Sequence, residues 1–140
     1  MTVAQNLRSV ADLCRIGAKR TLDAQLALGN KPDDPVAALL WEQRYTRLQG
    51  QLNSLSALNS KLTAAAVSEG LKEYEGELST IGEVSIAAQA KIKQIKEVSE
   101  LLTKIAKVLD LGLALLAAAA APSPATLVAL VNAGGAVADL

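Results

Sequence analysis

Apolar side chains recur every three or four residues along most of this 140-residue chain. That spacing places them on one face of an α-helix, because the helix completes a turn in about 3.6 residues. Alanine and leucine supply most of the apolar positions, and aromatic residues make up only 2% of the chain. Such a core suits closely packed helices. The pattern therefore predicts an all-α fold, an antiparallel helical bundle of three to four helices that forms a single domain over residues 1–140.

The longest stretch with helical spacing runs over residues 71–121 and contains no proline. Residues with high helix propensity dominate it. We therefore expect a long central helix at about 71–121, with residues 83–111 as its best-supported part. Gly76, Gly82 and Gly112 are the expected places for a bend or a break, because glycine costs about 1 kcal/mol relative to alanine inside a helix.

Capping signals delimit the two helices that precede this stretch. The first helix is expected at about 2–29, since Thr2 and Gln5 have the form of a capping box. Gly29 can adopt the left-handed conformation that ends a helix. The second helix is expected at about 35–69, with Asp34 as N-cap and Pro35 as its first residue.

The second helix carries an apolar seam with heptad spacing, which is typical of a coiled coil. The steps alternate between four and three residues through Trp41, Tyr45, Leu48, Leu52, Leu55, Asn59, Leu62 and Ala66. Asn59 is the one amide in this seam. Two arrangements fit the sequence equally well: Asn59 lies in the seam, or Leu58 takes the core position and Asn59 turns outward.

Residues 111–138 contain no charged side chain. Pro122 would end the central helix, and Ser123 with Pro124 would start a short last helix at about 124–133, ended by Gly134 and Gly135. A helix that is apolar on every side is either buried in protein or placed in a membrane. A bilayer span takes about 20 apolar residues, so the prolines leave each arm of this segment short.

The composition makes an enzyme improbable. The chain has no histidine, which is the commonest general acid or base and the commonest metal ligand. Cys14 is the only cysteine, so neither an internal disulfide nor a zinc site can form, and we expect a small apolar core residue there. The chain has no phosphate-binding loop and no nucleophile elbow. We expect no catalytic residue, no cofactor and no metal.

The first function hypothesis is a non-enzymatic interaction or assembly module that self-associates, or binds a protein partner, through apolar helix faces. The net charge is zero, so copies repel one another little, and nothing favours nucleic acid as a partner. The residues expected at the interface are Trp41, Tyr45, Leu48, Leu52, Leu55, Leu111, Leu115, Leu116, Leu127 and Leu130.

The second hypothesis is a membrane-active protein. An amphipathic bundle with a long apolar hairpin-like segment is similar in general plan to the α-helical pore-forming toxins, and this resemblance depends on residues 111–138. Lys104 and Lys107 would then lie close to lipid. The N-terminus lacks the basic start and apolar run of a secretory signal, so we expect a cytoplasmic or membrane-associated protein. We favour the first hypothesis, because short apolar runs are more often buried core.

Overall fold

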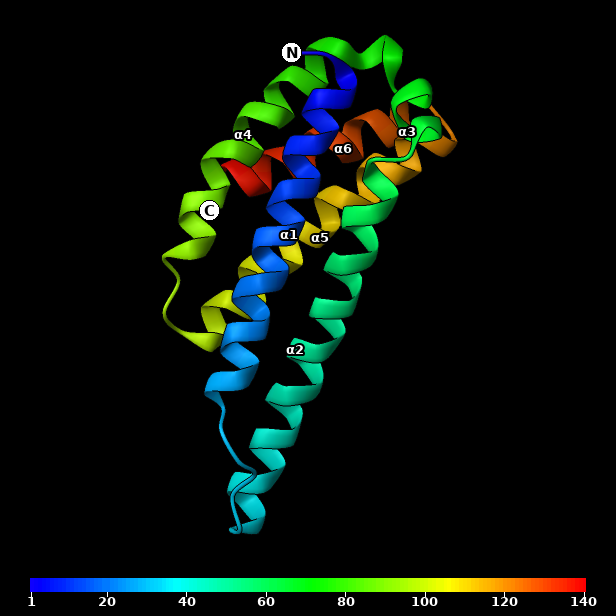
Figure 1. Cartoon of the computed structure of the whole chain (residues 1–140). Coiled ribbons are helices and arrows are strands. Elements are labelled where there is room, and N and C mark those ends of the chain that lie inside the picture. Colours follow the sequence, from blue (N-terminus) through cyan, green and yellow to red (C-terminus); the bar gives the residue numbers. More distant parts are fainter.

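The computed structural model describes all residues 1–140, and all of its regular elements are helical (Figure 1). This confirms the predicted all-α class. The elements are α1 (Val3–Ala27), α2 (Pro35–Leu62), α3 (Ala65–Gly70), a 3₁₀ turn (Lys72–Tyr74), α4 (Glu75–Lys93), α5 (Val98–Ala120) and α6 (Pro124–Ala138).

Helix α1 lies at the centre of the bundle and contacts α2, α4 and α5. Helix α6 packs against α5 and α4. In Figure 1 the end of α1 and the beginning of α2 extend past the other helices, beyond the turn between α4 and α5. The connection between α1 and α2 therefore forms a projecting tip at one end of the molecule.

The prediction of one long central helix is wrong. Residues 71–121 are divided into the 3₁₀ turn, α4 and α5, and residues 94–97 separate α4 from α5. The break at residues 94–97 lies inside residues 83–111, the part expected to be most securely helical. None of the three glycines predicted as places for a break lies there. The guanidinium of Arg20 on α1 donates to the Ile95 carbonyl oxygen from Nε at 3.1 Å and from Nη2 at 2.6 Å. Ile92 and Ile95 are both buried beside this turn.

The physical reason for the break is packing. An unbroken helix of this length would be about 75 Å long and would leave much of its apolar face in water. The turn at residues 94–97 lets α4 and α5 cover the same core from two sides. Helix propensity does not reveal such a turn, because most helix stability in proteins comes from tertiary packing.

Two other predicted boundaries are wrong. Helix α2 ends at Leu62, and the chain turns into α3, whose Gly70 lies against α5. A Cβ atom on Gly70 would lie 2.5 Å from the Ala119 carbonyl oxygen, so the two backbones approach closely there. Helix α6 continues through Gly134 and Gly135 to Ala138, with Gly134 packed against Ile81 of α4. Gly70 and Gly134 thus permit close helix packing, and Gly134 and Gly135 do not end α6 as predicted.

The capping signals predicted for the first two helices are confirmed. Thr2 and Gln5 form both hydrogen bonds of a capping box, at 2.8 and 3.1 Å. The Asp34 carboxylate accepts from the Ala37 N–H at 2.9 Å. Gly29 has a φ of +68°, a left-handed conformation that other residues rarely adopt. These features depend on neighbours within a few residues, which is why they can be recognised in the sequence.

One continuous core joins all the α-helices except α3, which packs against it through Val67. Its members are almost all leucine, isoleucine, valine and alanine, as the composition indicates. Leu58 is buried and Asn59 is only half-buried, so of the two arrangements left open for the seam the structure has Leu58 in the core. Cys14 is completely buried, as expected of a small apolar core residue.

Candidate functional site

The first part of α2 is the least covered helical segment of the bundle. The buried residues of α2 are Leu48, Leu55, Leu58 and Leu62, so none of its residues before Leu48 is buried. Helix α1 covers one side of this segment, where the Gln25 side-chain amide donates to the Tyr45 carbonyl oxygen at 3.5 Å. The opposite side has no helix packed over it.

Three large apolar residues lie on that opposite side. Val36, Leu39 and Leu40 keep 78%, 57% and 49% of their surface exposed. We define the outer face of α2 by six residues: Val36, Leu39, Leu40, Gln43, Arg44 and Arg47. Four of them, at positions 36, 40, 43 and 47, have the spacing of a coiled-coil seam, which would suit packing against a further helix.

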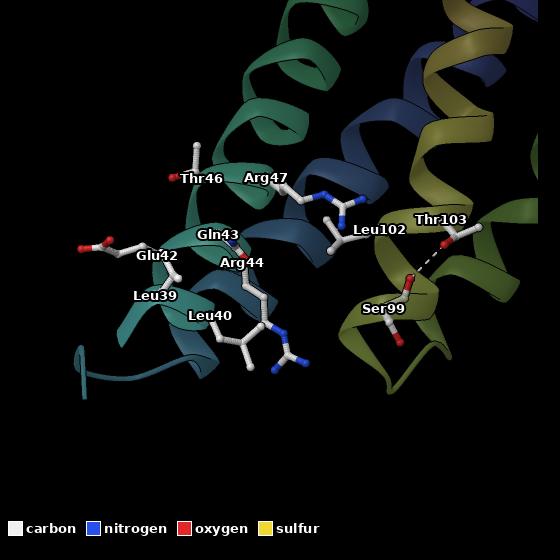
Figure 2. Close-up of a pocket in the computed structure, with 10 residues that line it drawn as sticks. All are labelled: Leu39, Leu40, Glu42, Gln43, Arg44, Thr46, Arg47, Ser99, Leu102 and Thr103. Atoms are coloured by element: carbon white, nitrogen blue, oxygen red, sulfur yellow. Dashed lines mark hydrogen bonds between the residues drawn. The ribbon is translucent and has the colours of Figure 1, made fainter. Parts of the chain in front are cut away.

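An open groove of about 670 Å³ runs between the outer face and the beginning of α5. Figure 2 shows Leu40, Arg44 and Arg47 extending from α2 toward this groove, while Glu42 and Thr46 point to the other side of the helix. The α5 wall consists of Ser99, Leu102 and Thr103. The groove has room for several side chains from a second molecule.

Charges of both signs flank the exposed leucines. Arg44 and Arg47 form no ion pair within the chain, and neither does Asp33. Asp34 uses one carboxylate oxygen to cap α2. Nearby, Lys31 and Glu42 are already paired with each other. The carboxylates of Asp33 and Asp34 thus directly precede the outer face, and the unpaired guanidinium groups of Arg44 and Arg47 lie at its end.

The structure separates the apolar residues predicted for an interface into two groups. Trp41 and Tyr45 stack with ring centroids 5.0 Å apart and remain partly exposed, and Leu52, Leu116 and Leu127 are half-buried. The remaining five are completely buried in the core of a single chain: Leu48, Leu55, Leu111, Leu115 and Leu130. These five are not accessible to a partner in this structure.

Sequence analysis missed Val36, Leu39 and Leu40. The available signal was short: Val36 and Leu40 are one helical turn apart, Leu39 is next to Leu40, and the same 4–3–4 spacing continues only through the polar Gln43 and Arg47. The sequence showed two apolar stripes on this helix without showing which one the rest of the chain would cover. Only the position of α1 reveals that the stripe beginning at Val36 is free.

The two lysines predicted to lie close to lipid are both on α5, and one of them is next to the C-terminus. Lys104 forms an ion pair with Glu100 at 2.8 Å, and its Nζ lies 3.5 Å from the Leu140 carbonyl oxygen. Lys107 is half-buried. Both lysines therefore lie partly covered on α5, and Lys104 already has an acidic partner.

Burial strongly changes the chemistry of Cys14. Desolvation raises the pKa of its thiol from 9.0 to about 12, because the thiolate loses its hydration. We expect Cys14 of the folded protein to resist a thiol-reactive reagent at pH 8 and to react once denaturant unfolds the chain. Fast labelling of the folded protein would contradict this burial. Because the folded pKa is the higher one, this group favours folding below about pH 9 and loses that contribution as the pH rises toward 12.

Three comparisons give no relative from which a function could be transferred: no protein-family model, no curated protein and no solved structure matches this chain. No three histidine, cysteine or acidic side chains are grouped so that they could hold a metal ion. None of the helices combines the length and the apolar character that crossing a membrane would take. The exposed surface is therefore the feature from which a function can be inferred.

Proposed function

We propose that this protein is a non-enzymatic interaction module that self-associates through the outer face of α2. One observation carries the proposal: Val36, Leu39 and Leu40 lie exposed on one side of a projecting helix. Burying one such side chain completely is worth about 1.5–3 kcal/mol relative to leaving it in water. Clustered exposed apolar residues with a polar rim are typical of protein-interaction sites.

A second copy of the chain is the partner that the charges favour. Two carboxylates that form no ion pair, Asp33 and Asp34, directly precede the outer face, and the face ends with two guanidinium groups that form no ion pair, so one copy can complement another. The net charge of zero leaves little long-range repulsion between copies. Three large apolar side chains are few for a permanent interface, so we expect an association that depends on protein concentration.

Changing Leu39→Glu and Leu40→Glu together is expected to convert the self-associated protein to a monomer. Two carboxylates would then have to lose water at the centre of the contact. Both leucines are about half exposed in the single chain, so thermal stability should change little. Sedimentation equilibrium over a range of protein concentrations gives the mass directly.

The matched control is Leu113→Glu, because Leu113 lies on α5, outside the outer face, and is 58% exposed. This variant should associate as the unchanged protein does. The proposal fails if the unchanged protein keeps the mass of one chain up to about 1 mM, where association would be worth only about 4 kcal/mol. It also fails if the double variant associates normally.

A second candidate function is binding to a membrane surface, and one specific observation favours it. The α5–α6 region has no charge over residues 111–138, and three of its large side chains are exposed: Leu113, Val128 and Val131. Exposed apolar side chains on a segment without charges can lie against lipid headgroups and the outer acyl chains. Leu113 lines a groove with Lys61 of α2, and Val131 lines another with Glu77 of α4. These side chains are separate from the outer face of α2, so the two functions can be tested independently.

Flotation with liposomes tests the second candidate. If it holds, the protein floats with the liposomes, and Leu113→Glu weakens that binding because a carboxylate resists entry into the lipid interface. Leu40→Glu should leave flotation unchanged. A protein that stays at the bottom of the gradient at every lipid concentration contradicts membrane binding and leaves the self-association proposal intact.

A further inference from the structure

Charged residues of opposite sign lie at the two ends of the outer face of α2, at similar distances from its leucines. The carboxylates of Asp33 and Asp34 precede the two leucines, and the guanidinium groups of Arg44 and Arg47 follow them. Leu40 lies midway in the sequence between Asp33 and Arg47. Leu39, its neighbour, lies midway between Asp34 and Arg44. The two midpoints are adjacent residues, so this acid–apolar–base order is self-complementary when one copy is reversed against another.

We propose that two copies pack their α2 helices antiparallel across a two-fold axis that passes close to Leu39 and Leu40. This inference rests on the proposed self-association and specifies its geometry. Each leucine pair meets at the axis. Asp33 of one copy lies opposite Arg47 of the partner subunit, and Asp34 lies opposite Arg44 of the partner subunit. A two-fold contact uses the same patch on both copies, as the single outer face requires.

The extent of the uncovered segment agrees with this register. The helical part from Pro35 to Arg47 is about 18 Å long at a rise of 1.5 Å per residue, and Asp33 lies just before it. Leu48, the next residue, is buried in the core of its own chain. The proposed contact therefore ends where the bundle begins to cover α2. The groove beside Leu40 and Arg44 gives room for side chains of the second helix.

A parallel arrangement is opposed by the same charges. It would place each carboxylate next to the same carboxylate of the partner subunit, and each guanidinium group next to the same guanidinium group of the partner subunit. Like charges that face each other across an interface suppress that pairing. The antiparallel arrangement turns every one of these contacts into an attraction between opposite charges.

Single-cysteine variants test the register. Cys14 is buried and its thiol has a raised pKa, so an introduced surface cysteine is the reactive one. Leu40→Cys places a thiol near the proposed axis, where the two copies of position 40 approach each other. Ser54→Cys is the control: Ser54 is exposed on the same helix, and its two copies would be about 40 Å apart along the helix axis. We expect a short bismaleimide to cross-link the first variant and not the second.

Charge reversal gives an independent measurement. Asp33→Arg alone and Arg47→Asp alone should each lower the association constant about tenfold, because each places like charges across the interface. The double variant Asp33→Arg/Arg47→Asp restores opposite charges at these positions. It should recover the association constant of the unchanged protein. Asp33 makes no hydrogen bond or ion pair within the chain, so its replacement should leave the fold unchanged.

The outcomes separate this geometry from the self-association itself. Cross-linking at both position 40 and position 54 in a dimer indicates a parallel pair and overturns the antiparallel register. A dimer that cross-links at neither position, or a double charge variant that does not recover, also overturns it. In each of these cases the protein still self-associates, so the proposed function stands. Only a protein that remains a monomer at every concentration contradicts both the proposed self-association and its antiparallel geometry.

Discussion

Leu115→Ala is expected to lower the free energy of unfolding by about 3–5 kcal/mol, the largest effect among the single substitutions considered. Leu115 is completely buried in the core although it lies in the uncharged part of α5. Its removal takes apolar contacts from the core and leaves a cavity that closely packed helices fill only in part. Urea unfolding followed by circular dichroism gives the change through the transition midpoint.

The control for Leu115→Ala is Leu113→Ala, two residues earlier on the same helix. Leu113 is 58% exposed, so its truncation should change the free energy of unfolding by at most about 0.5 kcal/mol. Leu115→Ala should leave the tendency to self-associate unchanged at concentrations where the chain is folded. Equal destabilisation by both variants, or loss of association without destabilisation in Leu115→Ala, would contradict the assignment of Leu115 to the core of one chain.

The second large effect is expected at the turn between α4 and α5. Arg20→Ala should lower the free energy of unfolding by about 1.5–3 kcal/mol, the value for hydrogen bonds that involve a charged group. The Ile95 carbonyl oxygen would lose both of its contacts with the guanidinium, at 3.1 and 2.6 Å. Hydrogen exchange should also become faster at residues 94–97, because the turn would lose the contact that fixes it to α1.

Two variants separate the role of this hydrogen bond from a general effect of charge. Arg20→Lys keeps the positive charge and can replace only one of the two contacts, so its destabilisation should lie between those of the unchanged protein and Arg20→Ala. Arg15→Ala removes an arginine whose only ionic contact is an exposed one, with Asp12 at 3.8 Å. It should have almost no effect. A loss in Arg15→Ala as large as that in Arg20→Ala would show that the turn is not held by Arg20.

The proposed interaction surface depends on the bundle that carries it. From Leu48 onward, α2 is fixed by leucines buried against the rest of the core. Before that residue the same helix continues without cover on its outer side. A rigid helix thus presents Val36, Leu39 and Leu40 in a defined arrangement, which lowers the entropy that a partner contact must offset. Substitutions in the outer face should therefore change association, and substitutions in the core should change stability.

The sequence by itself determined the helical class and the local signals at several helix ends. Thr2 with Gln5, Asp34 with Pro35, and Ser123 with Pro124 start helices as expected, and Gly29 adopts the predicted left-handed conformation. Each of these features is a hydrogen bond or a backbone conformation set by residues within about four positions. Interactions between residues so close in the chain can be predicted from the sequence alone.

Only the tertiary structure decided where the long apolar stretch divides and which apolar stripe of α2 is free. The turn at residues 94–97 is held by Arg20, which is 75 positions away from Ile95 in the chain. The stripe through Leu48 and Leu55 is buried because α1 and α5 pack against it, while Leu40 borders an open groove and stays 49% exposed. Both outcomes depend on contacts between distant segments, and two stripes of similar spacing carry no local mark of which one will be covered.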